Sequence, residues 1–395
     1  MKITPQELGL IFIFFTVTFI SASVENGYYF LLPYLEGRGV AVGTLGGVAM
    51  GVCYGVSFLM RPFIPIFEQR FGDEKMFWGG YLCLFISAAC TAIFSEAILS
   101  VITWRCVFGL GLSMVGVSLT AYERKFIPEE IRGLSIALIT TAYSIPSLIV
   151  VPAMEFFVSR GFYRCYIFFF PLLIVAGAAI IRRMPRFDAE ERAEGKNDCA
   201  SPSYILMLRN PQTTLFALTA ALFALTDAGQ LTFVRLSSEL GLAASCFFSV
   251  SAATAVFLRI FCGRLLDLLP RMAFAPTATA VTSAVMFAVT SASSILALML
   301  CGFVFGIGMG FGYPVLMCLI LDLGGKAYVT RLAVVFGLIY SGSFFMTPVL
   351  MEFLTGVAGS VASAYRITYG SIFLVTAMLI PICANVCRKG GGKAI

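Results

Sequence analysis

Two glycine-containing apolar motifs recur in the two halves of the chain. Residues 107–112 read VFGLGL and residues 304–309 read VFGIGM. A second pair precedes them, FLMR at 58–61 and FLR at 257–259, and each copy is followed by a short polar turn. Repetition at a fixed spacing is the sequence signature of duplicated structural units. The chain is therefore predicted to consist of two similar halves.

Both halves are apolar enough to be embedded in a membrane. Hydrophobic residues make up 59% of the 395 residues, charged residues make up 12%, and the mean hydropathy is +0.93. Because a helix needs about 20 apolar residues to cross a bilayer, the sequence predicts an all-α membrane protein with twelve transmembrane helices. We expect them at 8–34, 42–66, 76–95, 97–121, 133–157, 163–182, 212–236, 242–266, 272–291, 293–321, 332–355 and 365–387.

A central polar segment divides the predicted helices into two bundles of six. Residues 183–211 combine charged residues with proline and serine, which is typical of a linker. The N-terminal bundle is expected to span 1–182 and the C-terminal bundle 212–395. The Tyr-Arg pair at 163–164 recurs at 365–366, and both copies lie on the same side of the predicted membrane. The repeat is therefore expected to be parallel and not inverted.

The distribution of positive charge predicts the orientation in the membrane. Most of the 27 Lys and Arg residues lie on the same side as both termini, and cytoplasmic loops are enriched in positive residues. Both termini are therefore expected in the cytoplasm. The absence of disulfide patterning fits a bacterial inner membrane, and the protein is expected to be a monomer. The net charge of +6 follows from this topology and does not indicate nucleic-acid binding. Five arginines fall on the outer side: Arg38, Arg160, Arg164, Arg235 and Arg366.

The polar turn after the second predicted helix of each half resembles the signature turn of the major facilitator superfamily. The first copy, 65–73, reads PIFEQRFGD, with Gln69 in place of the signature's aspartate. The second copy, 263–271, reads GRLLDLLPR and keeps both the glycine and the aspartate. The segment 105–111 resembles the family's R-x-x-x-G-x-G element. The GIGMGFGYP run at 306–314 looks most like the sugar and small-molecule efflux permeases.

This resemblance covers essentially the whole chain and implies the major facilitator fold, two pseudo-symmetric six-helix bundles. It also implies a cytoplasmic gate at the two polar turns. Polar side chains at one helix end can accept hydrogen bonds from a neighbouring end, while arginines pair across the turn. The alternative is that these charges only fix the topology. The expected gate residues are Arg61, Gln69, Arg70, Gly72, Arg259, Gly263, Arg264, Asp267 and Arg271.

Among the ionisable residues inside predicted spans, three stand out: Glu25, Arg105 and Asp227. Such residues cost about 2.5–3.5 kcal/mol each on insertion scales, so they are seldom present without a role. Glu25 and Asp227 form a repeat pair, because VENGYYF aligns with TDAGQLTF and each acid precedes a glycine by two positions. All three are expected roughly 12–14 Å below the outer surface, at 1.5 Å per residue. The resemblance implies that their helices line a central cavity.

Two interpretations of this layer are open. In the first, Glu25 and Asp227 exchange protons or bind a cationic group, and Arg105 tunes Glu25. In the second, Glu25 and Arg105 form a structural ion pair. The sequence contains no histidine, so a carboxylate is the expected proton carrier near neutral pH. Amide and aromatic side chains nearby are expected to line the cavity: Asn26, Tyr28, Tyr29, Gln230 and Tyr313.

These features predict a secondary active transporter that exports a small amphipathic cationic or zwitterionic compound in exchange for protons. Two acids against one base favour a cargo with positive character. One alternative is proton-coupled uptake of a small polar solute, such as an organic acid or a sugar, and another is a membrane sensor without transport. No nucleophile–base pair, metal-ligand set or phosphate-binding loop is apparent, which argues against an enzyme. No cofactor is expected.

Overall fold

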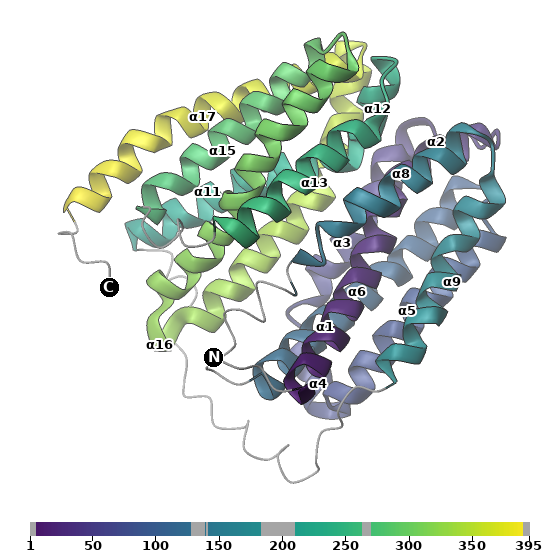
Figure 1. The fold of residues 1–395 in the computed structure, drawn as a ribbon, viewed down its shortest axis with the longest axis horizontal. Coiled ribbons are helices and arrows are strands. Elements are labelled where there is room, and N and C mark those ends of the chain that lie inside the picture. The colour runs from purple at the N-terminus through teal and green to yellow at the C-terminus, as the bar shows by residue number, and fades with distance from the viewer. Residues whose placement is uncertain (1–4, 128–138, 140, 183–209, 263–269, 390–395) are drawn as a thin grey trace. The chain divides into compact units, whose positions relative to one another are not determined.

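The computed structural model describes residues 5–127, 139, 141–182, 210–262 and 270–389 (Figure 1). Throughout these residues the regular elements are helices, so the predicted all-α class is confirmed. The chain divides into two compact units, Met1–Asn197 and Asp198–Ile395. Most of the predicted linker lies outside the described residues.

The elements of the first unit follow the order expected for its bundle. They are α1 (Pro5–Gly27), η1 (Tyr28–Phe30), α2 (Leu31–Gly37), η2 (Gly43–Leu45), α3 (Gly46–Met60), α4 (Ile64–Phe71), α5 (Asp73–Ile93), α6 (Ile98–Phe126), α8 (Ile145–Ser159) and α9 (Tyr163–Ile181). The turn expected at 65–73 is largely helical, because α4 occupies most of it. Gly72, with φ +79°, then separates α4 from α5. A positive φ is readily adopted only by glycine.

The second unit contains α11 (Pro211–Ala228), α12 (Gln230–Glu239), α13 (Ala244–Phe261), α15 (Arg271–Ala288), η6 (Val289–Ser291), α16 (Ile295–Ala358) and α17 (Val361–Lys389). Local sequence explains where its helices begin and end. The side chain of Asn210 accepts a hydrogen bond from the backbone N–H of Gln212 at 3.0 Å, which caps α11 ahead of Pro211. Gly359, with φ +78°, ends α16 in the left-handed conformation.

The described helices are long and apolar enough to account for the predicted spans. Ten of the described helical segments could each cross a membrane, and the broken pair α11 and α12 would make an eleventh. The remaining predicted span, 133–157, overlaps α8, a shorter apolar helix. These segments overlap all twelve predicted spans. The chain is therefore an integral membrane protein.

The long helix α16 contains two of these spans, Ile295–Leu323 and Arg331–Ala358. Tyr313 and Tyr340 lie in different spans, and a straight helix would separate them by about 40 Å. Their ring centroids are instead 5.6 Å apart. One buried apolar cluster contains residues of both spans, including Val315 and Phe336. The helical path therefore folds back on itself, as two separate predicted spans at 293–321 and 332–355 require.

Helix α6 packs closely against α3 at Gly109. A Cβ atom at this position would collide with the backbone carbonyl of Cys53. Backbone cannot rotate away as a side-chain tip can, so the two helices would have to separate. On the same helix, Gly116 is exposed, and a Cβ atom there would meet nothing within 4 Å.

We therefore expect Gly109→Ala to destabilise the protein by about 1–3 kcal/mol, the usual penalty of overpacking. Gly116→Ala is the matched control, and it should be neutral or stabilising by up to about 1 kcal/mol because alanine favours helix. Thermal unfolding of the two purified variants in the same detergent compares them directly. Equal melting temperatures would contradict the close approach of α3 and α6.

Candidate functional site

In the first unit, Glu25 lies on α1 and faces α3. The hydroxyl of Tyr54 donates a hydrogen bond to Oε2 of Glu25 at 3.1 Å. Sequence reasoning missed Tyr54, because no local pattern distinguishes it from the other tyrosines of the spans. The contact shows that a neutral hydroxyl is the hydrogen-bonding partner of this carboxyl group.

Arg105 lies on α6 and is almost fully buried, with 2% of its surface exposed. Its Nε donates to the carbonyl of Ala49 at 3.3 Å, and its Nη2 donates to the carbonyl of Met50 at 3.0 Å. The guanidinium carbon lies 4.7 Å from the ring centroid of Tyr28 and 5.3 Å from that of Phe108. Arg105 thus ties α6 to α3 through hydrogen bonds to the backbone.

The structure describes both Glu25 and Arg105, and these two residues do not form an ion pair with each other. The guanidinium still lies close enough to Glu25 to interact with it electrostatically. An ion pair joining α1 to α6, one of the two sequence interpretations, is therefore not what holds these helices together here. The positive charge is nevertheless retained beside the carboxyl group.

In the second unit, Asp227 lies near the end of α11 and is 8% exposed. The side-chain amide of Gln230, one of the expected lining residues, donates to Oδ1 of Asp227 at 2.5 Å. Arg259 on α13 lies within electrostatic range of Asp227, as does Tyr340 on α16. Arg259 also donates from Nη2 to the carbonyl of Met309 at 3.4 Å. Arg259 was expected at the cytoplasmic gate, and that assignment stays a prediction; the structure adds an electrostatic interaction between Arg259 and Asp227.

Both carboxyl groups precede an interruption of their helix. Helix α1 ends at Gly27, two residues after Glu25, and continues through η1 into α2. Helices α11 and α12 meet at Gly229, two residues after Asp227, with a bend of 42°. The predicted span 212–236 is therefore broken and not continuous.

A tyrosine from the last helix of each unit satisfies the carbonyl exposed at the interruption. The hydroxyl of Tyr166 on α9 donates to the carbonyl of Gly27 at 3.1 Å, and that of Tyr365 on α17 donates to the carbonyl of Gly229 at 2.7 Å. An unpaired carbonyl inside a membrane is costly, so these bonds stabilise the breaks. The sequence repeat pairs Tyr365 with Tyr163, but it is Tyr166, almost one helical turn further along, that makes the equivalent contact.

The other expected lining residues contact neighbours within their own unit. Asn26 donates from Nδ2 to Oγ of Ser147 at 3.1 Å, which joins α1 to α8. Tyr28 stacks on Phe170 with a centroid separation of 4.4 Å. Tyr29 is 7% exposed. Tyr313 makes edge contacts with the rings of Phe336 and Tyr340, at 5.9 and 5.6 Å.

The expected gate residues of the first unit lie around α4. Arg61 follows the end of α3, and Gly72 forms the turn before α5. Gln69 belongs to α4, and its side chain is outside the described residues. Arg70 is exposed, with its guanidinium carbon 5.7 Å from the ring centroid of Phe71.

One of the expected gate residues of the second unit, Arg271, contacts an acid that was not identified from the sequence. Gly263, Arg264 and Asp267 lie outside the described residues. Arg271, at the start of α15, donates from Nη1 to both carboxylate oxygens of Asp322 on α16, at 2.9 Å each. The two residues are 51 positions apart, so sequence alone offered no signal that would pair them.

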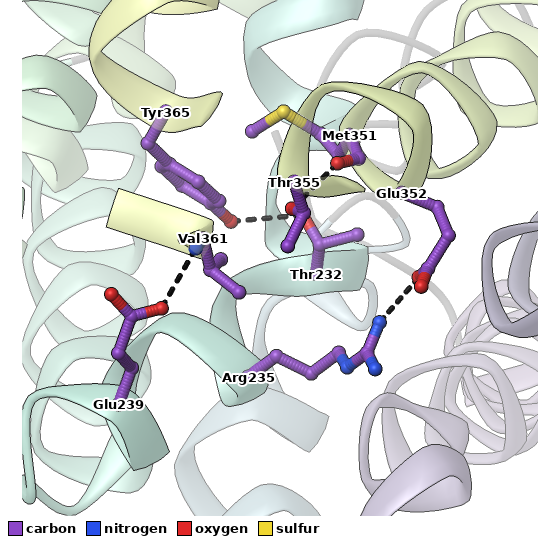
Figure 2. Close-up of polar contacts among 8 residues, drawn as sticks. All are labelled: Thr232, Arg235, Glu239, Met351, Glu352, Thr355, Val361 and Tyr365. Carbon is purple, nitrogen blue, oxygen red and sulfur yellow. Dashed lines mark hydrogen bonds and ion pairs between the residues drawn. The ribbon is translucent and has the colours of Figure 1, made fainter. Parts of the chain in front are cut away.

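At the opposite end of the second unit, α12 is held by charged contacts, shown in Figure 2. Arg235 on α12 forms an ion pair with Glu352 on α16, and the side chains are 26% and 15% exposed. Glu239, at the end of α12, accepts a hydrogen bond from the backbone N–H of Val361 at 2.8 Å and so caps α17. Tyr365 lies 3.0 Å from the hydroxyl of Thr232. The segment beyond the Gly229 break is therefore fastened to both α16 and α17.

We expect the Arg235–Glu352 pair to stabilise the second unit measurably because it is mostly shielded from solvent. A double-mutant cycle with Arg235→Gln and Glu352→Gln should give a coupling energy of about 1–2 kcal/mol, larger than the 0.2–1 kcal/mol typical of exposed pairs. The measurement is thermal unfolding of the wild type, both single variants and the double variant. Strictly additive effects would show that the pair contributes nothing.

The described residues contain no group of three or more His, Cys, Asp or Glu side chains that could hold a metal ion. What they bring together, in each unit separately, is one membrane-embedded carboxyl group, a neutral hydrogen-bond donor to it, and an arginine within electrostatic range. Such an arrangement suits binding of a proton or a charged solute.

Comparison with solved structures shows the same fold over almost the whole chain. A POT family transporter in complex with a thioalcohol-conjugated peptide matches with a TM-score of 0.74 and 12% identity, over 95% of this chain and 96% of that chain. A POT family transporter in complex with 5-aminolevulinic acid matches with a TM-score of 0.71 and 13% identity, over 95% and 96%. A D-xylose–proton symporter matches with a TM-score of 0.73 and 12% identity, over 94% and 96%.

No curated protein sequence matches the chain significantly. The sequence model of the Major Facilitator Superfamily, in contrast, matches residues 14–348. That match covers most of the chain and both of its units, and it agrees with the fold of the solved transporters. The protein is a membrane transporter, not an enzyme, and it belongs to the major facilitator superfamily.

Proposed function

We propose that this chain is a proton-coupled secondary transporter that works by alternating access, with Glu25 and Asp227 as its proton-exchanging groups. One observation carries the proposal: in each unit, a carboxyl group lies in the first helix two residues before the glycine at which that helix is interrupted. Each carboxyl accepts a hydrogen bond from a neutral side chain, Tyr54 or Gln230, and forms no salt bridge with another residue that the structure describes. A carboxyl group held in this way can gain or lose a proton without rupture of an ion pair.

The charges favour a zwitterionic cargo. Glu25, Asp227 and Arg105 alone are two acids and one base, which favours a cationic cargo. Arg259, which interacts electrostatically with Asp227, adds a second base, so that two acids face two bases. Arg105 ties α6 to α3 through two backbone carbonyls, and we propose that Arg259, which interacts electrostatically with Asp227, attracts the cargo's negative end. The carboxylates attract its ammonium group. The relatives bound to a conjugated peptide and to 5-aminolevulinic acid are consistent with a cargo of this chemistry.

We further propose export by exchange with protons, across a bacterial inner membrane with both termini in the cytoplasm. Binding of an ammonium group and binding of a proton compete for the same carboxylate, which is the requirement for antiport. The positive charge on the side of the termini supports this orientation. The rival function is proton-coupled uptake of a polar solute such as an organic acid or a sugar, with a sugar–proton symporter among the structural relatives. We also propose that the protein acts as a monomer.

Everted membrane vesicles with an acidic interior and a pH-quenched dye test this function. Zwitterionic and cationic compounds should dissipate the gradient in vesicles that contain the protein and not in vesicles that lack it. A response to anions or sugars alone would contradict the zwitterion proposal and favour uptake. A ligand-induced rise in melting temperature without any flux would identify the protein as a sensor.

At the cytoplasmic ends of the helices, we propose that Arg271 and Asp322 are part of a latch that closes this face, together with Asp267, Arg264 and Arg70. The bidentate contact between α15 and α16 supports the proposal. Asp322→Asn should weaken the latch, so that cysteines introduced on the cytoplasmic side react severalfold faster with a water-soluble maleimide. If neither this reaction rate nor transport changed, Asp322 would have no role in a latch and would only help to fix the membrane topology.

A further inference from the structure

A cavity of about 500 Å³ opens at one end of the first unit, and neither Glu25 nor Arg105 lines it. It lies where the end of α2, the end of α5 and the start of α9 come together. Apolar and aromatic side chains form most of its wall, and two arginines contribute its charge. The lining residues used below are Tyr34, Arg38, Ala92, Phe162, Arg164 and Phe168.

The charge of this cavity is positive. Nη1 of Arg38 donates to the hydroxyls of Tyr34 and Ser95, both at 2.9 Å, which fixes the guanidinium while leaving its other N–H groups available. Arg164 is exposed at the second position of α9 and forms no ion pair with any carboxylate of the described residues. None of the described residues that line the cavity is acidic. Two guanidinium groups with no carboxylate between them favour a phosphate, which each can bind through paired hydrogen bonds.

An apolar path leads from the cavity along the membrane-facing side of α9. Phe168, Leu172 and Val175 are 44%, 68% and 54% exposed and recur at intervals of four and three residues, so they share one helix face. Ile93, at the end of the neighbouring helix α5, is 60% exposed. Helices α5 and α9 pack side by side (Figure 1). In an integral membrane protein, such a face contacts lipid chains.

We propose that this cavity is a binding site for an anionic phospholipid, whose phosphate binds Arg38 and Arg164 and whose acyl chain lies along the α9 face. The combination of a fixed guanidinium, an exposed guanidinium and a continuous apolar path matches a ligand that is anionic at one end and hydrocarbon at the other. A bound lipid would join α2, the segment beyond the Gly27 interruption, to α5 and α9. The site would therefore stabilise the end of the first unit.

Native mass spectrometry of the delipidated full-length protein tests the proposal. Phosphatidylglycerol should bind in preference to phosphatidylcholine of the same chain length. Arg164→Gln should weaken phosphatidylglycerol binding by about five- to tenfold, the effect of losing one charge-assisted contact. Arg160→Gln is the matched control, since Arg160 is exposed on the adjoining turn, rests over Phe156 and does not line the cavity. That variant should bind as the wild type does.

Three results would overturn the proposal. Equal loss of binding in Arg164→Gln and Arg160→Gln would reveal unspecific surface attraction. Unchanged binding in the double variant Arg38→Gln, Arg164→Gln would place the lipid elsewhere. Displacement of phosphatidylglycerol by millimolar inorganic phosphate would show that the cavity holds a free anion and that the apolar path contributes nothing. A melting temperature for each variant confirms that the protein compared is folded.

Discussion

Asp227→Asn is expected to reduce pH-gradient-driven transport by at least about 100-fold, which corresponds to roughly 2.7 kcal/mol of lost coupling. Asparagine has nearly the shape of aspartate, and its Oδ1 can still accept the hydrogen bond from Gln230. The fold and the break at Gly229 should therefore survive. What disappears is the ability to exchange a proton and to carry a negative charge beside Arg259. The measurement is the dye response of everted vesicles together with the melting temperature of the purified variant.

Glu25→Gln should behave in the same way, because the amide oxygen can accept the hydrogen bond from Tyr54 that Glu25 now accepts. Glu96→Gln is the control, since Glu96 is an exposed carboxylate at the end of the first unit, away from this cluster. Its removal should leave transport unchanged. Normal flux in both Glu25→Gln and Asp227→Asn would exclude the two carboxyl groups as the proton carriers.

Arg105→Ala is expected to cause the largest loss of stability, on the order of 3 kcal/mol. The change leaves the carbonyls of Ala49 and Met50 buried without their donors and removes the cation that rests on the rings of Tyr28 and Phe108. Each orphaned carbonyl costs about 1–3 kcal/mol, and lost packing adds to this. Arg105→Ala should therefore unfold at a much lower temperature than the wild type and be recovered in reduced amount.

Arg105→Lys separates the two roles of this residue. Lysine keeps the positive charge near Glu25 but lacks the planar fork that reaches two carbonyls at once. We expect an intermediate melting temperature and transport closer to normal than in Arg105→Ala. If Arg105→Ala were as stable as the wild type, the hydrogen bonds to α3 would not be what holds α6 in place, and the residue would have to be reassigned to cargo binding.

The long apolar runs of the chain were sufficient to predict its spans, but long-range contacts decide where these spans bend or break. The break at Gly229 illustrates the difference. Glycine weakens a helix by only about 1 kcal/mol, so the predicted span 212–236 was continuous. The bend becomes stable because Tyr365, 136 positions away, donates to the exposed carbonyl. No local pattern contains that information.

The two acids of the candidate site could be predicted from the sequence, but the side chains that interact with them could not. Glu25 and Asp227 are conspicuous because carboxylates are rare inside apolar runs. Arg259 was assigned to the gate because the FLR motif that ends at Arg259 matches the FLMR motif that ends at Arg61, next to a polar turn. The sequence did not indicate that Arg259 also interacts electrostatically with Asp227 on another helix. The direction in which a side chain extends depends on packing, which sequence spacing does not reveal.

Coupling of cargo transport to Glu25 and Asp227 is tested by recording proton movement and cargo movement together in one set of proteoliposomes. The internal dye pyranine reports protons, and a labelled zwitterion identified in the vesicle assay reports cargo. We expect a fixed ratio of protons to cargo in the wild type and no cargo-evoked proton movement in the Glu25→Gln, Asp227→Asn double variant. Cargo-evoked proton movement of normal size in that variant would contradict this coupling.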